Sequence, residues 1–439
     1  MAESANYPRV LVIAVNPISR VQSNGLMMRS FFEGWPRDRL AQIYFPFFHR
    51  FPPDASVCDK YLRVNPLGIA KEQTLLPDVR ATRAGASRLV TTARMLARSP
   101  KFRTRFVDPV REILAASPWL DREVLRYSRS FKPDVVYSLL GTLGTTRAAA
   151  LVAQDLNCPV VPHFTDHWIE TRFVGSPFES YFRRQLQLWL HRVIERSPVL
   201  LTMSRAMAEE YARRFPREAV SLTTLVEQAP YLRAECGPEN NPSTLRLVYA
   251  GNLGLKRWTV LKHLGIVLEK LKVEGIESRL EIYCSEEDRR QYQREIAVPG
   301  IIDLKEWVAP SQLPELLTEA DVLVHVESPD SSLLHYTRFS FSTKLSHYMM
   351  AGRCLLLVGP SDAGSMQEVQ EMGGGVVVSP TTPGALEQAV RQVLTDHSFR
   401  SEMGNKARKL ALEHFEGTGQ RARFRRILSA AAAQSTDRP

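Results

Sequence analysis

The sequence predicts an α/β fold built from two doubly wound, Rossmann-like domains. Strand-length apolar runs alternate with helix-length amphipathic segments along most of the chain, which is the pattern of parallel sheets covered by helices. The alternation stops in a segment rich in Pro, Asn and Gly at 228–244 and then starts again. With 439 residues and 44% hydrophobic content, the chain can bury a large core, and its length favours two or three domains.

Five apolar runs in the first half have the length and composition of buried parallel strands. They are RVLVIAV (9–15), AQIYF (41–45), DVVYSLL (134–140), PVVPHF (159–164) and PVLLTMS (198–204). The interval of about 50–130 is expected to be mostly helix and loop, inserted between strands. We therefore predict a first domain over 1–230, followed by a linker over 231–244.

The pattern restarts after the linker with six further strand-like runs. They are LRLVYAG (245–251), RLEIYC (279–284), IIDLKEWV (301–308), DVLVHVE (321–327), CLLLVGP (354–360) and GGVVVSP (374–380). We predict a second Rossmann-like domain over 245–410 and a helical extension over 411–439 that packs back on the first domain. A ligand is expected outside the carboxyl ends of the strands, in a cleft across which the two domains face each other.

The cysteines and the amino-terminal sequence favour a cytoplasmic protein. The five cysteines are far apart, with no pair at the spacing of a metal or redox site. The first 15 residues lack a basic stretch followed by a long apolar one, and the longest apolar runs are too short to span a bilayer. We predict a cytoplasmic location, which leaves open peripheral attachment to the cytoplasmic face of the inner membrane.

The net charge of +10 predicts anionic partners. Basic residues concentrate over 80–111, where apolar residues interleave at near-helical spacing. This segment is either a solvated helical face or a contact with an anionic membrane surface. Nucleic acid is the least favoured partner, and we predict none.

Several familiar motifs are absent. The sequence has no Walker loop, no HExxH, no G-x-S-x-G and no G-x-G-x-x-G after the first strand of either domain. It also has no Asp-x-Asp pair, so it lacks the usual ligands of a divalent metal that bridges a nucleotide diphosphate. We predict no metal site and no bound cofactor.

The turn YAGNLGLKRW (249–258) is the first candidate site. Glycine at 251 and 254 lets the backbone turn tightly and approach a ligand, and Arg257 stands at the expected start of a helix. The free N–H groups of a helix start suit a phosphate. The alternative is an ordinary strand-to-helix turn with solvated basic residues.

A second candidate lies at Ser342, Thr343 and Lys344, where a helix is expected to begin. Either hydroxyl can cap the helix while the next backbone N–H groups point outward. Lys344 opposes the helix dipole in the first turn, which costs a few tenths of a kcal/mol unless an anion binds there. A lysine in a locally unfavourable place therefore indicates anion binding.

At this point the chain resembles a known family. STKLSHYMMAGRCLLLVG (342–359) is similar to the S-K-x-x-E-Y-M-A-A-G-K-P-V segment of retaining family 4 glycosyltransferases, which have the GT-B fold. LVYAGNLGLKRW (247–258), LPELLTEADVLVHV (313–326) and NGLMMRSFFEGWPRDRLAQIY (24–44) resemble the branch found among bacterial polysaccharide-assembly enzymes. The resemblance extends over about 9–415.

The resemblance implies a nucleotide-diphosphate sugar held mainly by the second domain and an acceptor held mainly by the first. By position, Arg257 and Lys344 would bind the diphosphate and act in catalysis, together with the backbone around Ser342 and Thr343. The remaining expected donor contacts are Gly251, Asn252, Gly254 and His347. Retention of configuration is likewise implied by the family.

One departure from the family pattern affects donor recognition. Many members carry two glutamates eight positions apart, where this chain has Phe339 and His347. The second glutamate usually accepts hydrogen bonds from the nucleotide ribose, and a neutral ring nitrogen of His347 could replace it. The alternative is that His347 is a partly buried helix residue.

In the first domain, VPHFTDHWIE (161–170) contains the candidates for the reacting sugar and the acceptor. By family position, His163 would hydrogen-bond the donor sugar, and Asp166 would orient the acceptor hydroxyl or stabilise positive charge on the sugar ring. The predicted cleft residues are Asn24, Gly25, His167 and Trp168. A purely structural network and, less favoured, a metal site are the alternatives.

The predicted function is transfer of a sugar to a polysaccharide or lipid-diphosphate-linked oligosaccharide. A nucleotide-sugar 2-epimerase of the same fold is disfavoured, because paired acid/base carboxylates are not apparent in the sequence. A catalytically silent sugar-nucleotide-binding protein is the alternative from a different class.

Overall fold

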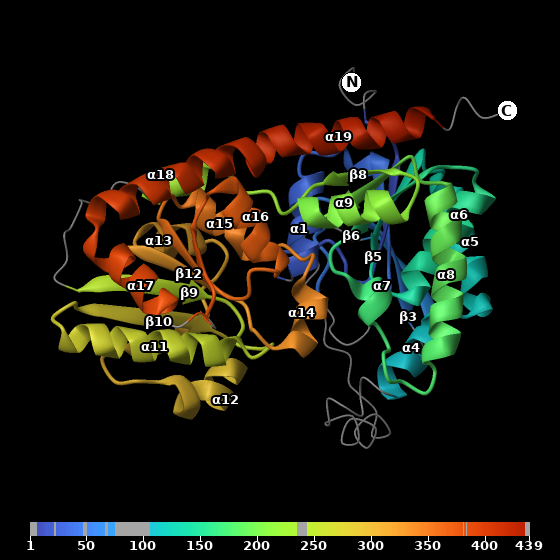
Figure 1. Cartoon of the computed structure of the whole chain (residues 1–439). Helices are drawn as coiled ribbons and strands as arrows, with labels where there is room; N and C mark the ends of the chain where they lie inside the picture. The colour runs from blue at the N-terminus through green and yellow to red at the C-terminus, as the bar shows by residue number, and fades with distance from the viewer. Residues whose placement is uncertain are drawn as a thin grey trace. The chain divides into compact units, whose positions relative to one another are not determined.

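The computed structural model describes residues 7–21, 23–46, 51–65, 69–74, 106–234, 244–380, 382 and 384–434. They form two compact units, which are best followed by colour in Figure 1. Unit 1 contains Met1–Leu222 and Arg421–Pro439, and unit 2 contains Thr223–Gln420. The chain therefore leaves unit 1 once and returns to it at its carboxyl-terminal end, whereas the sequence analysis set the first boundary at residue 230.

Unit 1 is built on an eight-stranded sheet in the order β4-β3-β2-β1-β5-β6-β7-β8. All neighbouring strands are parallel except β3 and β4, which are antiparallel. The strands are β1 (Val10–Ala14), β2 (Leu40–Tyr44), β3 (Lys60–Asn65), β4 (Ile69–Thr74), β5 (Val135–Leu140), β6 (Val160–Phe164), β7 (Val199–Thr202) and β8 (Glu218–Ser221). The central strands β1, β2, β5 and β6 are buried along their whole length, because helices cover a parallel sheet on both faces.

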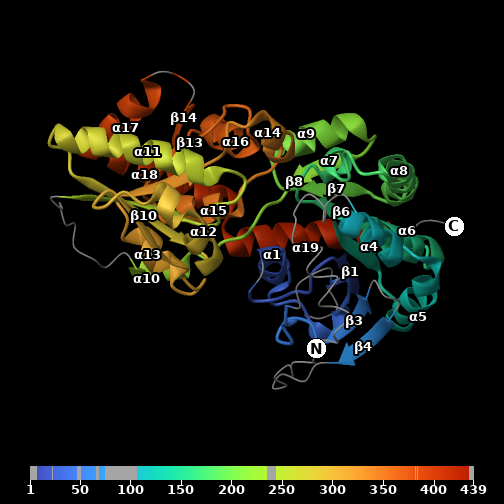
Figure 2. The same cartoon turned by 90° about the horizontal axis from the view of Figure 1, so that it is seen from below.

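The helices of unit 1 connect these parallel strands. They are α1 (Ser23–Phe32), α4 (Asp108–Ala115), α5 (Asp121–Phe131), α6 (Leu143–Asp155), α7 (Trp168–Thr171), α8 (Glu179–Glu195) and α9 (Arg205–Arg214), with 3₁₀ turns η2 (Arg37–Arg39) and η4 (Pro118–Leu120). Helices α6 and α8 lie side by side in both views (Figures 1 and 2). Thr142 and Ser204 cap α6 and α9 by accepting a backbone N–H through the side-chain oxygen.

Unit 2 is built on a six-stranded, all-parallel sheet in the order β11-β10-β9-β12-β13-β14. The strands are β9 (Leu245–Ala250), β10 (Ser278–Cys284), β11 (Ile302–Glu306), β12 (Val322–Val326), β13 (Cys354–Val358) and β14 (Val376–Val378). The helices are α10 (Ala229–Ala234), α11 (Arg257–Val273), α12 (Glu286–Ile296), α13 (Leu313–Thr318), α14 (Ser331–Thr337), α15 (Thr343–Met350), α16 (Gly364–Met372), α17 (Ala385–Thr395) and α18 (His397–His414).

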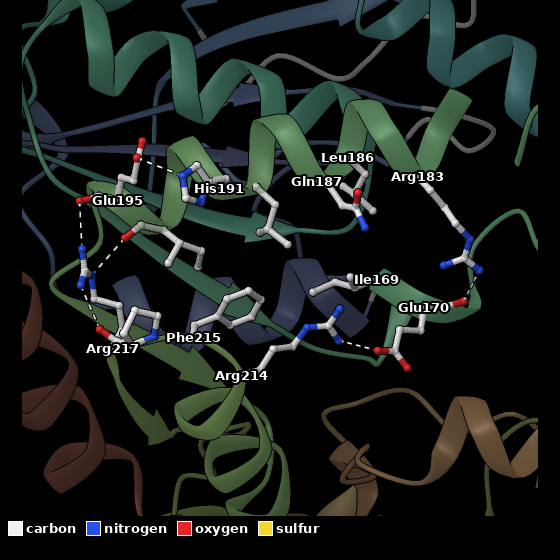
Figure 3. A pocket seen from close by; sticks show the side chains of 13 residues that line it. Ile169, Glu170, Arg183, Leu186, Gln187, His191, Glu195, Arg214, Phe215 and Arg217 are labelled. Atoms are coloured by element: carbon white, nitrogen blue, oxygen red, sulfur yellow. Dashed lines mark hydrogen bonds and ion pairs between the residues drawn. The ribbon is translucent and has the colours of Figure 1, made fainter. Parts of the chain in front are cut away.

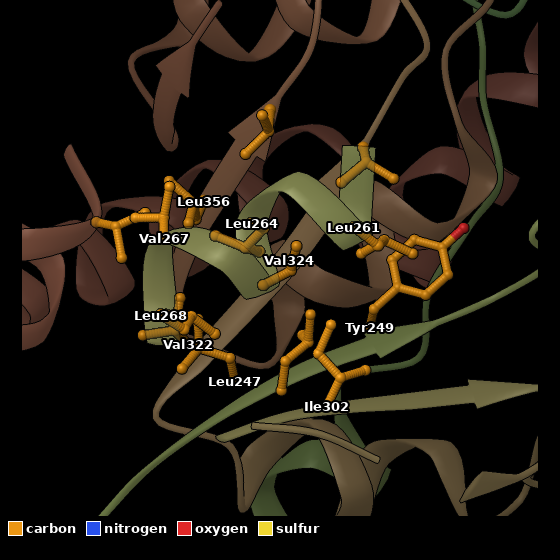
Figure 4. Close-up of a cluster of buried hydrophobic side chains, with 14 of the residues drawn as sticks. Leu247, Tyr249, Leu261, Leu264, Val267, Leu268, Ile302, Val322, Val324 and Leu356 are labelled. Atoms are coloured by element: carbon orange, nitrogen blue, oxygen red, sulfur yellow. The ribbon is translucent and has the colours of Figure 1, made fainter. Parts of the chain in front are cut away.

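Alternate residues of these strands enter two hydrophobic layers, one on each face of the sheet. Leu247 and Tyr249 of β9 join Leu261 and Leu264 of α11 in the layer drawn in Figure 4. Val248, between them in the chain, joins the opposite layer. The sheet is thus covered on both faces, as the doubly wound prediction requires.

Helix α19 (Gly417–Ala433) continues the chain from unit 2 into unit 1. Its Phe424 is fully buried in an aromatic cluster of unit 1. The ring stacks on Phe31 at 4.9 Å between centroids and meets Phe32 and Tyr137 edge-on at 5.2 and 5.3 Å. The carboxyl-terminal helix therefore completes the core of unit 1.

The structure confirms the predicted α/β architecture and shows three strands that the sequence analysis missed. Strands β3 and β4 lie in the interval expected to be mostly helix and loop, and β8 forms the far edge of the same sheet.

The segment predicted as a linker begins as α10, whereas 235–243 lie outside the described residues. Most of the basic segment 80–111 also lies outside them. No helix in the described part of the chain combines the length and apolarity of a membrane span.

Candidate anion-binding site

The main candidate site lies at the carboxyl ends of β9 and β12 in unit 2. These two strands are hydrogen-bonded neighbours, but the chain continues from β9 to β10 on one side and from β12 to β13 on the other. The strand order therefore reverses between them, and ligands of doubly wound sheets bind at such a point. The turn at 251–256 and Glu327 are the segments that follow the two strands.

Arg257 and Glu327 form a buried ion pair at this point. The Nη2 atom of Arg257 lies 3.2 and 3.1 Å from the two carboxylate oxygens of Glu327, and the side chains are only 11% and 5% exposed. Arg257 Nη1 also donates to Asn252 Oδ1 at 2.9 Å. Burial alone raises the pKa of Glu327, but His325, Arg257 and Lys344 together lower it to about 2, so the carboxylate is charged.

Lys344 brings a second cation to the same place. Its Nζ atom lies 4.2 Å above the centre of the Tyr249 ring and is buried without a hydrogen-bond partner among the described residues. Burial and the nearby Arg257 lower the pKa of Lys344 to about 7, although Glu327 opposes this shift. The site therefore holds two basic groups and one carboxylate, and its lysine has no anion of its own.

Gly251 provides the space that Lys344 occupies. A Cβ atom at this position would lie 2.6 Å from Lys344 Nζ and 3.1 Å from its Cδ. Any other residue would therefore push the lysine away from Tyr249. Gly254 has no such neighbour, since its nearest atom would be Asn252 Oδ1 at 3.7 Å.

The backbone just before Arg257 is strained. Leu255 and Lys256 both have left-handed backbone angles, with φ of 55° and 56°, a region that side chains other than glycine rarely adopt. The Lys256 ammonium is paired with Asp330, which follows β12, and the Tyr249 hydroxyl donates to the Asn252 carbonyl at 2.6 Å. A strained backbone persists only where surrounding contacts fix it, and such residues are common in functional loops.

Ser342 and Thr343 stand at the start of α15, beside Lys344. The Ser342 hydroxyl makes no capping hydrogen bond to the helix, whereas its backbone N–H donates to Ser365 Oγ at 3.0 Å. The hydroxyl at this helix start is thus not used as a cap.

His347, one turn further along α15, has a partner within unit 2. Its Nδ1 atom and the Tyr231 hydroxyl of α10 are 2.8 Å apart. Burial lowers the pKa of His347 to about 4, so the ring is neutral at pH 7. Phe339, at the position of the family's other glutamate, lies beneath the Arg338 guanidinium at 5.4 Å.

In unit 1, the segment expected to contact the reacting sugar puts His163 inside β6, with its side chain in the core of the unit. The ring is completely buried, with Nδ1 2.8 Å from the Tyr137 hydroxyl and the Phe31 ring 5.8 Å away. Burial lowers the pKa of His163 to about 4. Side chains alternate between the faces of a strand, and this register directs His163 into the core.

Thr165, Asp166 and His167 follow the carboxyl end of β6, a segment that we call the rim of unit 1. Asp166 is half-buried and accepts a hydrogen bond from the Thr165 hydroxyl at 3.3 Å. His167 Nε2 lies 3.1 Å from Glu170 Oε2, and Trp168 is buried. Across the described ranges, no three His, Cys, Asp or Glu side chains cluster as metal ligands would.

Asn24 and Gly25 lie in the first turn of α1, after the loop that follows β1. A Cβ at Gly25 would lie 2.8 Å from the Pro17 carbonyl oxygen, so only glycine allows this close packing. The buried Gln42 fixes the same loop by accepting from Ile18 N at 2.8 Å and donating to the Asn16 carbonyl at 3.0 Å.

Sequence reasoning did not identify Glu327, His325 or Tyr249 as members of the site in unit 2. His325 is fully buried in β12, and its Nε2 lies 3.2 Å from Glu327 Oε1 without hydrogen-bond geometry. One signal was available in the sequence: a glutamate directly ends the apolar run DVLVHVE.

No protein-family model matches the sequence, and neither does any curated protein. Solved structures do match. Sucrose-phosphate synthase from Thermosynechococcus elongatus has a TM-score of 0.63 at 12% identity, with 97% of this chain and 100% of that one covered. The Anabaena protein HepE in complex with UDP-glucose has a TM-score of 0.59 at 12% identity, covering 96% and 99% of the two chains.

A trehalose-phosphate synthase (UDP-forming) from Burkholderia vietnamiensis matches with a TM-score of 0.58 at 11% identity, covering 96% of this chain and 100% of that one. These proteins are GT-B glycosyltransferases. The chain has the GT-B fold. At identities of 10–12%, the structural similarity establishes the fold alone. Activity and substrate are therefore proposed below from the residues.

Proposed function

We propose that this GT-B protein is a glycosyltransferase whose unit 2 binds the diphosphate of a nucleotide sugar through Arg257 and Lys344. The supporting observation is the buried Lys344 ammonium, which has no hydrogen-bond partner among the described residues and stands where the strand order reverses. The ammonium lies 4.2 Å from the Tyr249 ring centre, and this cation–π contact keeps it in place without an anion. Structural neighbours bound to UDP-glucose and UDP support the same class of ligand.

The charges at this site suit a leaving diphosphate. Breaking the sugar–phosphate bond places negative charge on the departing group, and fixed positive groups stabilise that charge without reorganising. Arg257 is held in place by Glu327 and Asn252, and Lys344 is held in place by burial. These residues supply the stabilisation in our proposal, which involves no metal or further cofactor.

Unit 1 would hold the acceptor in this proposal. Asp166 is half-buried after β6, whereas His163 is completely buried, so we assign the orientation of the acceptor hydroxyl to Asp166. His163 would act indirectly, through Tyr137 and the packing of β6. We further propose retention of configuration, a glycan or lipid-diphosphate-linked acceptor, and action at the cytoplasmic face of a membrane.

Nucleotide binding tests the proposal first. Thermal-shift measurements with UDP, GDP, ADP and CMP are expected to identify one nucleotide that binds. The matching sugar donors are then tested for hydrolysis, and a slow release of sugar is expected. Replacing Lys344 or Arg257 by Ala should lower turnover by about 10²-fold. Lys262, exposed on α11, gives a matched control, Lys262→Ala.

Three results would contradict the proposal in different ways. Wild-type turnover in both the Lys344 and the Arg257 variants would remove these residues from the site. Isomerisation of the sugar without its release would indicate an epimerase. Nucleotide binding with no turnover in the presence of any acceptor would indicate a silent binding protein.

A further inference from the structure

A cavity in unit 1 shares no lining residue with the proposed diphosphate site. Its volume is about 740 Å³, within the range of small-molecule sites in proteins. Figure 3 shows it along α8, facing α7 and the turn after α9. None of its residues has a role in the proposed donor chemistry.

The cavity has an aliphatic wall formed by one face of α8. Leu186, Leu190 and Ile194 recur at every fourth position and so share one side of the helix. Ile169 of α7 and Phe215 lie opposite (Figure 3). These side chains offer no hydrogen bonds and suit a hydrocarbon chain. Gln187, His191 and Glu195 of α8 line the cavity beside them.

One end of the cavity carries arginines. Arg183 Nη2 donates to the Glu170 carbonyl at 3.0 Å, and Arg214 Nη1 lies 2.6 Å from Glu170 Oε1. Arg183 Nε also lies 2.9 Å from Glu179 Oε1. Both guanidinium groups are partly exposed, and exposed pairs of this kind contribute little stability. Arg214 can therefore exchange the carboxylate for a phosphate, which accepts two parallel hydrogen bonds from a guanidinium group.

The opposite end of the cavity has a different character. Arg217 donates to the carbonyls of Ile194, Glu195 and Pro216 at 3.1, 3.3 and 2.9 Å. Its guanidinium group caps the carboxyl end of α8, so its N–H donors are occupied by these carbonyls. The arginines whose partly exposed carboxylate partners an anion can replace are thus Arg183 and Arg214.

This arginine end adjoins the rim that carries Asp166. Glu170 lines the cavity, pairs with Arg214, and also lies 3.1 Å from His167 through its second carboxylate oxygen. His167 directly follows Asp166 in the chain. A phosphate at Arg214 would therefore stand next to the group proposed to orient the acceptor.

We propose that this cavity binds the isoprenoid-like chain of a lipid-linked acceptor, with the acceptor's diphosphate at Arg183 and Arg214. The proposal rests on the function argued above, chooses the lipid-linked acceptor named there, and assigns its binding site. The apolar chain lies along Leu186, Leu190 and Ile194, and the sugar-bearing end is directed to the rim at Asp166.

Calorimetric titration of the full chain with farnesyl diphosphate tests the proposal. No nucleotide is present, so the result is independent of donor chemistry. Saturable binding is expected, with inorganic diphosphate and farnesol each at least about tenfold weaker, because each lacks one half of the interaction. The Lys344→Met variant is expected to bind the probe like wild type, which excludes the donor site as its location.

Two matched pairs of variants locate the binding. Gln187 is an exposed cavity residue, whereas Leu188 beside it is exposed outside the cavity. Gln187→Trp should fill the cavity and weaken binding by about tenfold or more, and Leu188→Trp should not. Arg214→Gln should weaken binding of farnesyl diphosphate but not of farnesol, whereas Arg213→Gln, outside the cavity and paired with Glu210, should change neither.

Circular dichroism and thermal unfolding verify that each variant is folded. Gln187→Glu, a smaller change that repels the diphosphate, replaces the tryptophan variant if that one misfolds. The proposal is overturned by absence of saturable binding, by equal loss in the control variants, or by diphosphate or farnesol binding as tightly as the combined probe. Self-association of the chain that Gln187→Trp abolishes would also overturn it, since the cavity would then be a contact between two copies.

Discussion

The Nη2 atom of Arg257 lies 3.2 and 3.1 Å from the two carboxylate oxygens of Glu327, and both side chains are nearly removed from solvent. The two residues come from segments after neighbouring strands, 70 positions apart in the sequence. Glu327 is thus the internal counter-ion of Arg257 in this site.

Glu327→Ala should destabilise the protein and make its stability depend on ligand. Removal of one partner leaves a buried guanidinium uncompensated, which costs about 3–5 kcal/mol of unfolding free energy. Urea unfolding should show this loss, and saturating UDP should restore more stability in the variant than in wild type. Equal UDP stabilisation of both proteins would mean that the nucleotide phosphates do not reach Arg257.

Affinity for the nucleotide diphosphate should fall as the pH rises above 7. The pKa of Lys344 is lowered from 10.5 to about 7 by burial and Arg257, so in the free protein the charge is lost above this pH. Binding then requires uptake of one proton, and the dissociation constant should rise up to about tenfold per pH unit between 7 and 9. Titrations at several pH values measure the slope.

Lys344→Met is the control for this slope. The variant should bind weakly at pH 6 and show no change of affinity between pH 7 and 9. A slope that persists in the variant would assign the proton to a group other than Lys344.

The same pKa shift affects stability with a definite sign. Between pH 7 and 10.5 the unfolded lysine binds a proton that the folded one does not, so this residue makes the free protein more stable as the pH rises through that window. Urea unfolding of wild type and Lys344→Met over this range separates the contribution of the lysine from those of other groups.

The effect of Gly251→Ala on nucleotide affinity should act through Lys344. The added Cβ would lie 2.6 Å from the lysine Nζ and displace it, so UDP affinity should fall by about tenfold. In a double-mutant cycle, Gly251→Ala should cause no further loss in the Lys344→Met background. Additive losses would show that Gly251 contacts the ligand independently of the lysine.

The protein should lose stability on acidification between pH 6.5 and 4.5. Burial lowers the pKa of His163, His325 and His347 to about 4 each. The unfolded state therefore binds up to three more protons in this window, with a limiting slope of about 4 kcal/mol per pH unit. His347→Gln should reduce the slope by about a third, and an unchanged slope would mean that this histidine does not resist protonation.

The central strands could be predicted from the sequence because they are buried on both faces and are continuously apolar. The missed strands lie at or near the sheet edges. β4 and β8 are the two edge strands and contain the charged residues Lys71, Glu72 and Glu218. Edge strands carry charges that limit unwanted pairing. These charges interrupt the continuous apolar run by which the central strands were predicted.

The candidate site could be predicted only in part, for a similar reason. Lys344 and Arg257 were identifiable from local features, namely a cation at a helix start and a glycine-containing turn. The role of Glu327 depends on β9 lying beside β12, which the chain order does not reveal. The orientation of His163 depends on the register of β6, because a shift of one residue would turn its side chain to the other face of the sheet.

The path of α19 also has a consequence for biosynthesis. Phe424 supplies the middle of an aromatic cluster in unit 1, yet all of unit 2 is translated before it. Domains normally fold as the ribosome releases them, the amino-terminal one first. Here the earlier unit stays incomplete until the last stretch emerges, so premature termination before α19 would leave an otherwise intact second unit attached to a first unit with an open, aggregation-prone core.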